Sequence, residues 1–184
     1  MALIIGISGS LRAASFNSAL LRAAQGLMPP GSVLDIASIK DIPLYDGDLE
    51  AAAFPQAVTD LKERIVKADG LLLASPEYNN GVPGVLKNTV DWLSRPSADM
   101  KRVFDNRPVA IIGATPGRGA TSLAQAAWLP TLRTLGTRAW FGGRMGVASA
   151  GTVFDKEGNL VDTATREYLK TFIEGFVRFV QGAA

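Results

Sequence analysis

The 184-residue sequence contains neither cysteine nor histidine. Without cysteine the chain has no disulfide, no thiolate metal site and no cysteine nucleophile. Without histidine it has no Ser-His or Cys-His catalysis and lacks the commonest zinc ligand. An enzyme made from this sequence must therefore use carboxylates, lysine, tyrosine, backbone groups or a bound cofactor. A cysteine-free chain also suits a reducing compartment, so we expect a cytoplasmic location.

A strong excess of either charge is also missing. The 19 basic and 17 acidic side chains leave a net charge of +2, and the basic residues form no long run. We therefore expect no nucleic-acid partner. The apolar opening, residues 1–7, has no basic region and ends at Ser8, which is too early for a signal peptide or a spanning helix. We expect no membrane insertion, and the length predicts one domain over residues 1–184.

Apolar residues follow two periods along the chain. Five short segments bounded by turn residues predict strands at residues 3–7, 32–37, 70–74, 109–112 and 138–141. Helical spacing predicts helices at residues 17–28, from 55, at 83–94, up to about 135, and at 163–180. Pro130 is expected to bend or interrupt the fourth of these helices. Residues 38–53 are predicted to form a surface loop, and the glycine-rich residues 142–161 have no clear assignment.

Strands that alternate with helices indicate a parallel sheet with helices on both faces, an α/β three-layer sandwich. Five strands favour the flavodoxin-like order 2-1-3-4-5. The chain then winds off in opposite directions after strands one and three. This order predicts a ligand crevice at the carboxyl ends of those two strands.

The loop after the first strand, residues 8–17, is rich in hydrogen-bond donors. It supplies hydroxyls, an amide, the Arg12 guanidinium and free backbone N–H groups at a helix N-terminus. A phosphate monoester is recognised by such a set of donors together with a fixed cation. The alternative is a serine-rich helix cap with a solvated Arg12.

The loop after the third strand, residues 75–84, contains two prolines and two glycines, which give the backbone a defined shape. Such a backbone can present N–H and C=O groups to the edge of a flat heterocycle, with Tyr78 beside the ring. The alternative is a rigid turn with Tyr78 packed on the surface. We interpret Glu77 as structural or backbone-contacting rather than as a general base.

The loop after the fourth strand, residues 113–121, is rich in glycine but matches no phosphate-binding signature. Arg118 stands where the pattern GxxxxGK[ST] requires glycine. The opening strand and loop likewise match neither GxGxxG nor GxSxG, because Ser8 and Ser10 replace the required glycines. What remains is a flexible loop suited to covering the rim of a ligand, or an ordinary connection.

The first two loops together resemble the NADPH-dependent FMN reductase family, which includes the bacterial quinone and chromate reductases. The matching segments read GSLRxxSxN over residues 9–17 and SPEYN over residues 75–79. The second match continues through residues 83–96, and the PLYD at residues 43–46 is also similar. The resemblance covers at least residues 3–135.

This resemblance implies a flavodoxin-like fold, bound FMN and a homodimer or homotetramer. It implies that the FMN phosphate is held by Ser10, Arg12, Ser15 and Asn17. It implies that the isoalloxazine and ribityl are contacted by Pro76, Glu77, Tyr78 and Asn79. It implies that the pocket is completed by Thr115, Gly117 and Arg118. It also implies a structural or subunit-interface role for Lys87, Asp91, Trp92 and Arg95.

The resemblance implies an enzyme that passes two electrons from NADPH or NADH through FMN to a small-molecule acceptor such as a quinone, flavin, chromate or azo compound. The cofactor would carry the chemistry, so we expect no catalytic side chain. An alternative is a flavodoxin-type electron carrier without its own NAD(P)H oxidation, although such carriers usually present an acidic face. A third possibility is a regulatory or scaffold protein that has lost the cofactor. The acceptor, the preferred nucleotide and the tightness of FMN binding stay open.

Overall fold

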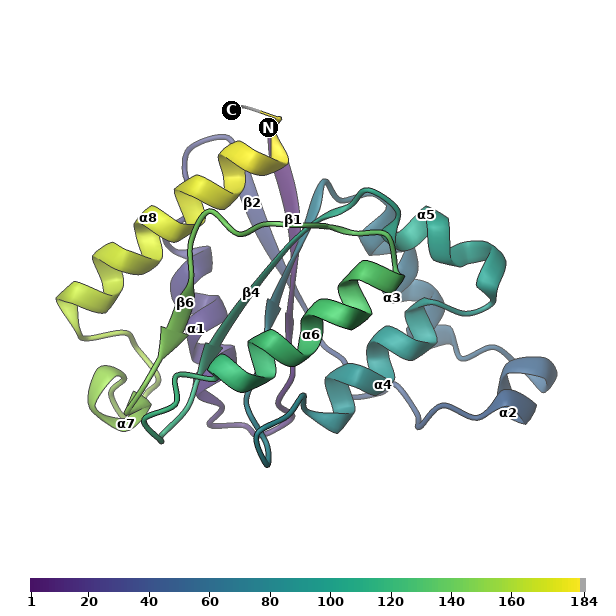
Figure 1. Cartoon of the computed structure of the whole chain (residues 1–184), viewed down its shortest axis with the longest axis horizontal. Helices are drawn as coiled ribbons and strands as arrows, with labels where there is room; N and C mark the ends of the chain where they lie inside the picture. The colour runs from purple at the N-terminus through teal and green to yellow at the C-terminus, as the bar shows by residue number, and fades with distance from the viewer. Residues whose placement is uncertain (183–184) are drawn as a thin grey trace.

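The computed structural model describes residues 1–182 of the chain and has one parallel β-sheet at its centre (Figure 1). Its main strands are β1 (Ala2–Ser8), β2 (Ser32–Ala37), β3 (Gly70–Ala74), β4 (Pro108–Ala114) and β5 (Arg138–Ala139). They lie in the order β2-β1-β3-β4-β5, and a further strand, β6 (Met145–Val147), also pairs with β4. The predicted flavodoxin-like order is therefore confirmed.

The helices within residues 1–182 surround this sheet. They are α1 (Phe16–Gln25), α2 (Gly47–Ala52), α3 (Gln56–Val66), α4 (Gly84–Leu93), α5 (Met100–Phe104), α6 (Ser122–Thr134), α7 (Ala150–Val153) and α8 (Thr163–Val180), with a 3₁₀ turn, η1 (Ser97–Asp99). Figure 1 shows α1 and α8 on one face of the sheet and α3, α4 and α6 on the other. None of the helices in this described part is long and apolar enough to cross a membrane.

Alternate residues of the strands enter two hydrophobic cores. Ile4 of β1 packs in the core shared with α1 and α8, whereas Ile5 and Ile7 pack in the core shared with α3, α4 and α6. Successive side chains of a strand point to opposite faces of the sheet. Because helices cover both faces of the sheet, the side chains that point to either face must be apolar. This explains the continuous apolar runs in the sequence.

The fifth predicted strand, residues 138–141, is shorter than expected. β5 ends after two residues, and residues 140–144 leave the sheet before β6 pairs with β4 again. Trp140 accounts for this departure, because its ring packs edge-on against Phe172 of α8 with the ring centroids 4.7 Å apart. Trp140 is partly buried against the core formed with α8, so packing of its ring stabilises the departure.

The segment predicted to be a surface loop, residues 38–53, contains helix α2. Asp46 caps this helix by accepting a 2.8 Å hydrogen bond from the N–H of Asp48. No side chain of α2 is buried, so the sequence carries no apolar stripe to reveal the helix. The segment is anchored by Trp92 of α4, which is fully buried and donates a 2.9 Å hydrogen bond to the carbonyl of Pro43.

Helix α6 runs through Pro130 without the interruption that the sequence suggested. Proline removes one backbone donor and leaves the carbonyl four residues earlier, that of Ala126, without its helical partner. Ala126 and Pro130 are both exposed, so water can satisfy this carbonyl. The helix therefore tolerates proline on its solvent face.

Candidate functional site

The loops that follow β1, β3 and β4 meet at one edge of the sheet and form a cleft. Most of the residues that the sequence predicted for the site line this cleft, namely Ser10, Arg12, Ser15, Asn17, Pro76, Glu77, Tyr78 and Thr115. Three more lining residues, Phe16, Ala114 and Pro116, were not predicted. Their only sequence signal is position, since each adjoins a predicted residue or ends a strand. Three predicted residues, Asn79, Gly117 and Arg118, are not part of the lining.

The first loop ends in a helix N-terminus that favours an anion. Ser15 is the N-cap of α1, and its hydroxyl oxygen accepts a 3.2 Å hydrogen bond from the N–H of Ser18. The N–H groups of Phe16 and Asn17 then stand in the first turn, where a helix offers no carbonyl partner. No acidic side chain lies in this turn to neutralise them. The positive end of the helix dipole therefore faces the cleft.

Arg12 provides the only full positive charge among the residues that line the cleft. It is exposed, and within residues 1–182 its guanidinium makes no hydrogen bond or ion pair. A guanidinium without an internal partner is free to pair with a phosphate in a bidentate manner.

The second loop forms a tight turn beside the first. Tyr78 and Gly81 exchange backbone hydrogen bonds of 3.2 and 3.0 Å across this turn. Between them, Asn79 and Asn80 have φ angles of 50° and 59°, which asparagine tolerates better than most residues. Asn79 thus shapes the turn at its tip. The Tyr78 side chain, 46% exposed, points its hydroxyl toward Ser10 Oγ at 3.4 Å.

Two side chains join the third loop to the other two. Asn17 is buried, and its amide group bonds both the carbonyl and the N–H of Ala114 at the end of β4. Glu77 uses Oε2 to accept hydrogen bonds from the N–H groups of Leu123 and Ala124 at the start of α6. The side-chain amide of Asn17 is therefore already bonded, and its backbone N–H is the group left for a phosphate.

Two glycines allow the three loops to approach closely. A Cβ added at Gly9 would lie 2.9 Å from side-chain atoms of both Pro76 and Pro83. A Cβ at Gly113 would overlap the Thr121 side chain and stand 2.5 Å from the Ser75 carbonyl oxygen. Both positions therefore require glycine.

A family model described as NADPH-dependent FMN reductase matches residues 2–151 of the chain. The chain belongs to the NADPH-dependent FMN reductase family. It is an oxidoreductase that uses FMN and a reduced nicotinamide nucleotide, as the two loop motifs predicted.

Relatives of this reductase match along almost their whole length. An NAD(P)H-dependent FMN reductase of Pseudomonas aeruginosa is 42% identical over 178 residues, covering 97% of this chain and 95% of the relative. A 2-hydroxy-1,4-benzoquinone reductase of a Burkholderia species is 37% identical and covers 98% of both chains. The solved structure of FerB, a flavoenzyme NAD(P)H:(acceptor) oxidoreductase from Paracoccus denitrificans, superposes with a TM-score of 0.88 at 31% identity, covering 99% of this chain and 98% of FerB.

The cleft of the reductase has the chemical groups that FMN requires. FMN consists of a phosphate, a polar ribityl chain and a flat ring system. Arg12 and the first turn of α1 supply a cation and N–H donors for an anion, and Ser10 adds a hydroxyl. The second loop provides exposed backbone and the Tyr78 ring. The donor set of the cleft therefore suits the cofactor.

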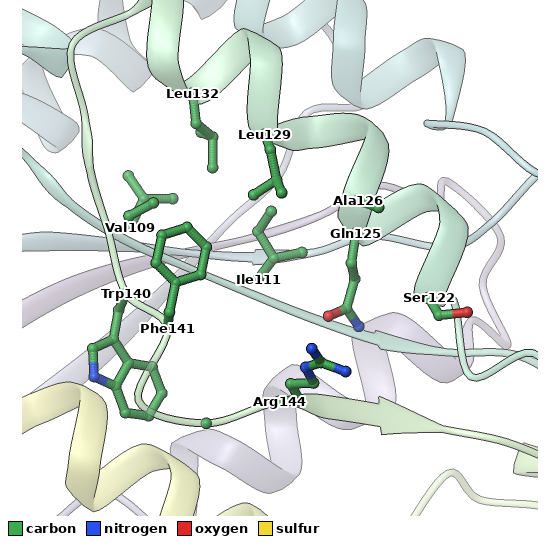
Figure 2. Close-up of a pocket in the computed structure, with 12 residues that line it drawn as sticks. Val109, Ile111, Ser122, Gln125, Ala126, Leu129, Leu132, Trp140, Phe141 and Arg144 are labelled. Atoms are coloured by element: carbon green, nitrogen blue, oxygen red, sulfur yellow. The ribbon is translucent and has the colours of Figure 1, made fainter.

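The reductase has a second hollow, of about 280 Å³, between α6, β4 and residues 140–144. Figure 2 shows Phe141 beside Val109 and Ile111, with Arg144 opposite Gln125. None of the predicted site residues lines it, and its walls are mostly apolar. Its polar lining consists of Ser122, Gln125 and Arg144, and the Gln125 amide already donates to Thr121 and to the Met145 carbonyl. The cleft at the three loops, which the two motifs line, is therefore the candidate FMN site.

Proposed function

We propose that the reductase binds FMN across the three loops and passes electrons from NADPH or NADH to a quinone. The observation that carries this proposal is the meeting of a free guanidinium, the N–H groups of Phe16 and Asn17 in the first turn of α1 and an exposed tyrosine in one cleft at the carboxyl ends of β1, β3 and β4. In this fold class, ligands bind where the strand order reverses, and that point lies between β1 and β3.

The first loop would hold the phosphate. Arg12 would pair with it, while the hydroxyl of Ser10 and the N–H groups at the start of α1 would donate hydrogen bonds. Ser15 would support this arrangement indirectly, because its hydroxyl caps helix α1. The Asn17 side chain would also act indirectly, because it bonds the backbone of Ala114. The backbone N–H of Asn17 would contact the phosphate.

The second and third loops would hold the ring. Pro76, Glu77 and Tyr78 of the second loop and Thr115 of the third loop all line the cleft. Asn79 would act through the shape of the turn, and the loop that carries Gly117 and Arg118 would cover the rim. FMN, when bound, accepts a hydride from the nicotinamide nucleotide and delivers two electrons to the acceptor. The role of this chain is to orient both partners and to leave one face of the ring accessible.

A quinone is the proposed acceptor because several relatives carry that name. The Burkholderia relative is named 2-hydroxy-1,4-benzoquinone reductase, and a Pseudomonas putida relative at 34% identity is named quinone reductase. A quinone is flat and can stack where the nicotinamide has left, so one binding space serves both halves of the reaction.

The test is an absorbance spectrum of the purified protein with FMN, followed by anaerobic addition of NADPH or NADH. We expect the flavin bands to bleach without a helper protein, and we expect a benzoquinone to restore them. Bound flavin that stays oxidised would indicate an electron carrier instead. Failure to bind FMN would refute the proposal altogether.

We also propose that the reductase is a homodimer or homotetramer. An apolar patch supports this idea, since Phe141 and Leu129 both line the second hollow and are 73% and 42% exposed. Patches of this kind often mark protein interfaces. By contrast, Trp92 is buried in its own chain, Lys87 pairs with Asp91, and Arg95 pairs with Glu50.

Light scattering coupled to size-exclusion chromatography tests the assembly. We expect a mass of two or four chains for the unaltered protein and a smaller mass for Phe141→Asp. Val161→Asp is the matched control, because Val161 is also exposed but does not line the second hollow. A monomeric unaltered protein would refute the oligomer.

Two simpler expectations remain proposals. We propose that residues 1–184 form one domain, supported by two cores that share a single sheet, and we expect one cooperative unfolding transition. The cytoplasmic location stays a prediction, which cell fractionation would test.

A further inference from the structure

Helix α6 starts from a turn that supplies a partner for the N–H of Ser122 but not for those of Leu123 and Ala124. Ala120 and Thr121 have φ angles of 49° and 57°, a left-handed conformation that is unfavourable for both residue types. Thr121 is the N-cap, yet its side chain accepts no hydrogen bond from the helix backbone. Its hydroxyl oxygen instead accepts a 3.1 Å bond from the side chain of Gln125. The N–H of Ser122 bonds the Gly119 carbonyl at 3.0 Å, but the N–H groups of Leu123 and Ala124 need a partner from elsewhere.

Glu77 is that partner, although it lies more than forty residues earlier in the chain. Its Oε2 accepts hydrogen bonds from the N–H of Leu123 at 2.9 Å and from the N–H of Ala124 at 3.0 Å. A carboxylate at a helix N-terminus is stabilised by the charge-assisted bonds and by the helix dipole. Glu77 thus replaces the local cap that Thr121 does not provide.

The same carboxylate also lies against the third loop. A Cβ added at Gly119 would stand 3.5 Å from Glu77 Oε1, so the backbone of this loop passes directly beside the carboxylate. Glu77 itself follows Pro76 in the second loop and lines the cleft. One side chain therefore connects the second loop to the third loop and to the start of α6.

The body of α6 has an independent attachment. Trp128 is fully buried and donates a 2.9 Å hydrogen bond to the hydroxyl of Ser75. The beginning of the third loop is also held independently, because Thr115 and Gly117 exchange backbone hydrogen bonds of 2.9–3.0 Å with residues 147–150. Loss of the Glu77 contact would therefore loosen the turn at residues 118–121 and the first turn of α6, while the rest of the helix stays packed.

We propose that Glu77 is a positioning residue that clamps the start of α6 and thereby holds residues 118–121 in place as the rim of the FMN site. This inference rests on the proposed FMN site. It assigns no proton transfer to Glu77, because the oxygen that reaches α6 is already bonded to two N–H groups.

The experiment compares Glu77→Ala with Glu77→Gln. The glutamine carbonyl oxygen can still accept both hydrogen bonds, whereas alanine removes the acceptor. Hydrogen exchange of residues 115–126 is measured first in protein without FMN, and FMN affinity is then measured by quenching of flavin fluorescence. Glu167→Gln, an exposed position on α8, is the control for the loss of one negative charge.

We expect Glu77→Ala to speed amide exchange in residues 115–126 and to weaken FMN binding by about five- to tenfold, the effect of a lost helix cap. Glu77→Gln is expected to retain slow amide exchange in residues 115–126 and most of the FMN affinity. The control is expected to match the unaltered protein in both measurements. Should Glu77→Ala fold poorly, Glu77→Asp gives the same test, because its shorter side chain withdraws the carboxylate from α6.

Unchanged exchange in Glu77→Ala would overturn the clamp. Weak FMN binding in Glu77→Gln, with normal exchange, would overturn it as well, because the charge would then act on FMN directly. The exchange measurement needs no cofactor. Absence of FMN binding by the unaltered protein would therefore refute the proposed function without deciding the clamp.

Discussion

The side chain of Asn17 exchanges two hydrogen bonds with the backbone of Ala114. Its Nδ2 donates to the Ala114 carbonyl at 2.9 Å, and its Oδ1 accepts from the Ala114 N–H at 3.0 Å. This pair links the start of α1 to the end of β4 inside the protein, where both partners are buried. It fixes the first and third loops relative to one another.

Replacing Asn17 with alanine should therefore destabilise the fold. The change leaves a buried N–H and a buried carbonyl without partners, which costs about 2–4 kcal/mol in the free energy of unfolding. Urea unfolding followed by tryptophan fluorescence measures this loss. Asn159→Ala is the control, since Asn159 is exposed and its loss should cost much less. An equal loss in both variants would contradict the role of the pair.

Arg12→Ala should weaken FMN binding with little change in stability. Its guanidinium has no partner within residues 1–182, so the fold loses nothing, while a charge-assisted contact with the phosphate is worth about 1.5–3 kcal/mol. This corresponds to roughly ten- to hundredfold in Kd, measured by flavin fluorescence titration. Arg166→Ala on α8 is the control. Unaltered FMN affinity in Arg12→Ala would contradict the proposal that Arg12 binds the FMN phosphate.

Gly113→Ala should destabilise the protein, whereas Gly84→Ala should not. The added methyl at Gly113 meets Thr121 and the Ser75 carbonyl, and such overpacking costs about 1–3 kcal/mol. The methyl at Gly84 meets nothing within 4 Å at the start of α4, where alanine favours the helix by up to about 1 kcal/mol. The midpoint denaturant concentration of guanidinium unfolding, measured for each variant and for the unaltered protein, tests both expectations. A tolerated Gly113→Ala would mean that the third loop is looser than the structure shows.

Glu50 makes part of the stability depend on pH. The Glu50 carboxylate accepts a 3.0 Å hydrogen bond from Arg95 and a 2.8 Å hydrogen bond from the Tyr45 hydroxyl. These bonds hold the pKa of Glu50 below its ordinary value of 4.5. A carboxyl group whose pKa is lowered by folding stabilises the folded protein fully when the pH is above the ordinary pKa. That contribution is lost as the pH falls below 4.5 and through the lowered folded pKa.

Glu50→Gln should therefore lower the Tm at pH 7, and the difference from the unaltered protein should shrink as the pH falls below 4.5. Thermal unfolding across this pH range measures the effect. Glu167→Gln, on an exposed part of α8, should show no such dependence. A difference that persists at low pH would show that Glu50 acts through packing rather than charge.

Much of the fold and the location of the site could be predicted because the relevant signals are local. The apolar runs of β1 and β3 and the stripe of α8 lie within windows of a few residues, and their alternation along the chain indicates a parallel sheet. The strand order was predicted by analogy with the flavodoxin-like fold. The motifs at residues 9–17 and 75–79 are equally local, and they indicated both the cofactor and the cleft. Sequence determined these features because secondary structure and short loops depend on neighbours along the chain.

Only the tertiary structure decided how the loops are held. Asn17 meets a backbone 97 residues away, and Glu77 meets the start of α6 at a separation of 46 residues. Trp140 leaves the sheet because an aromatic side chain of α8 lies where it can pack. No local pattern states which distant N–H, carbonyl or ring a side chain will meet. Those contacts form only when packing brings the partners within hydrogen-bonding or van der Waals distance.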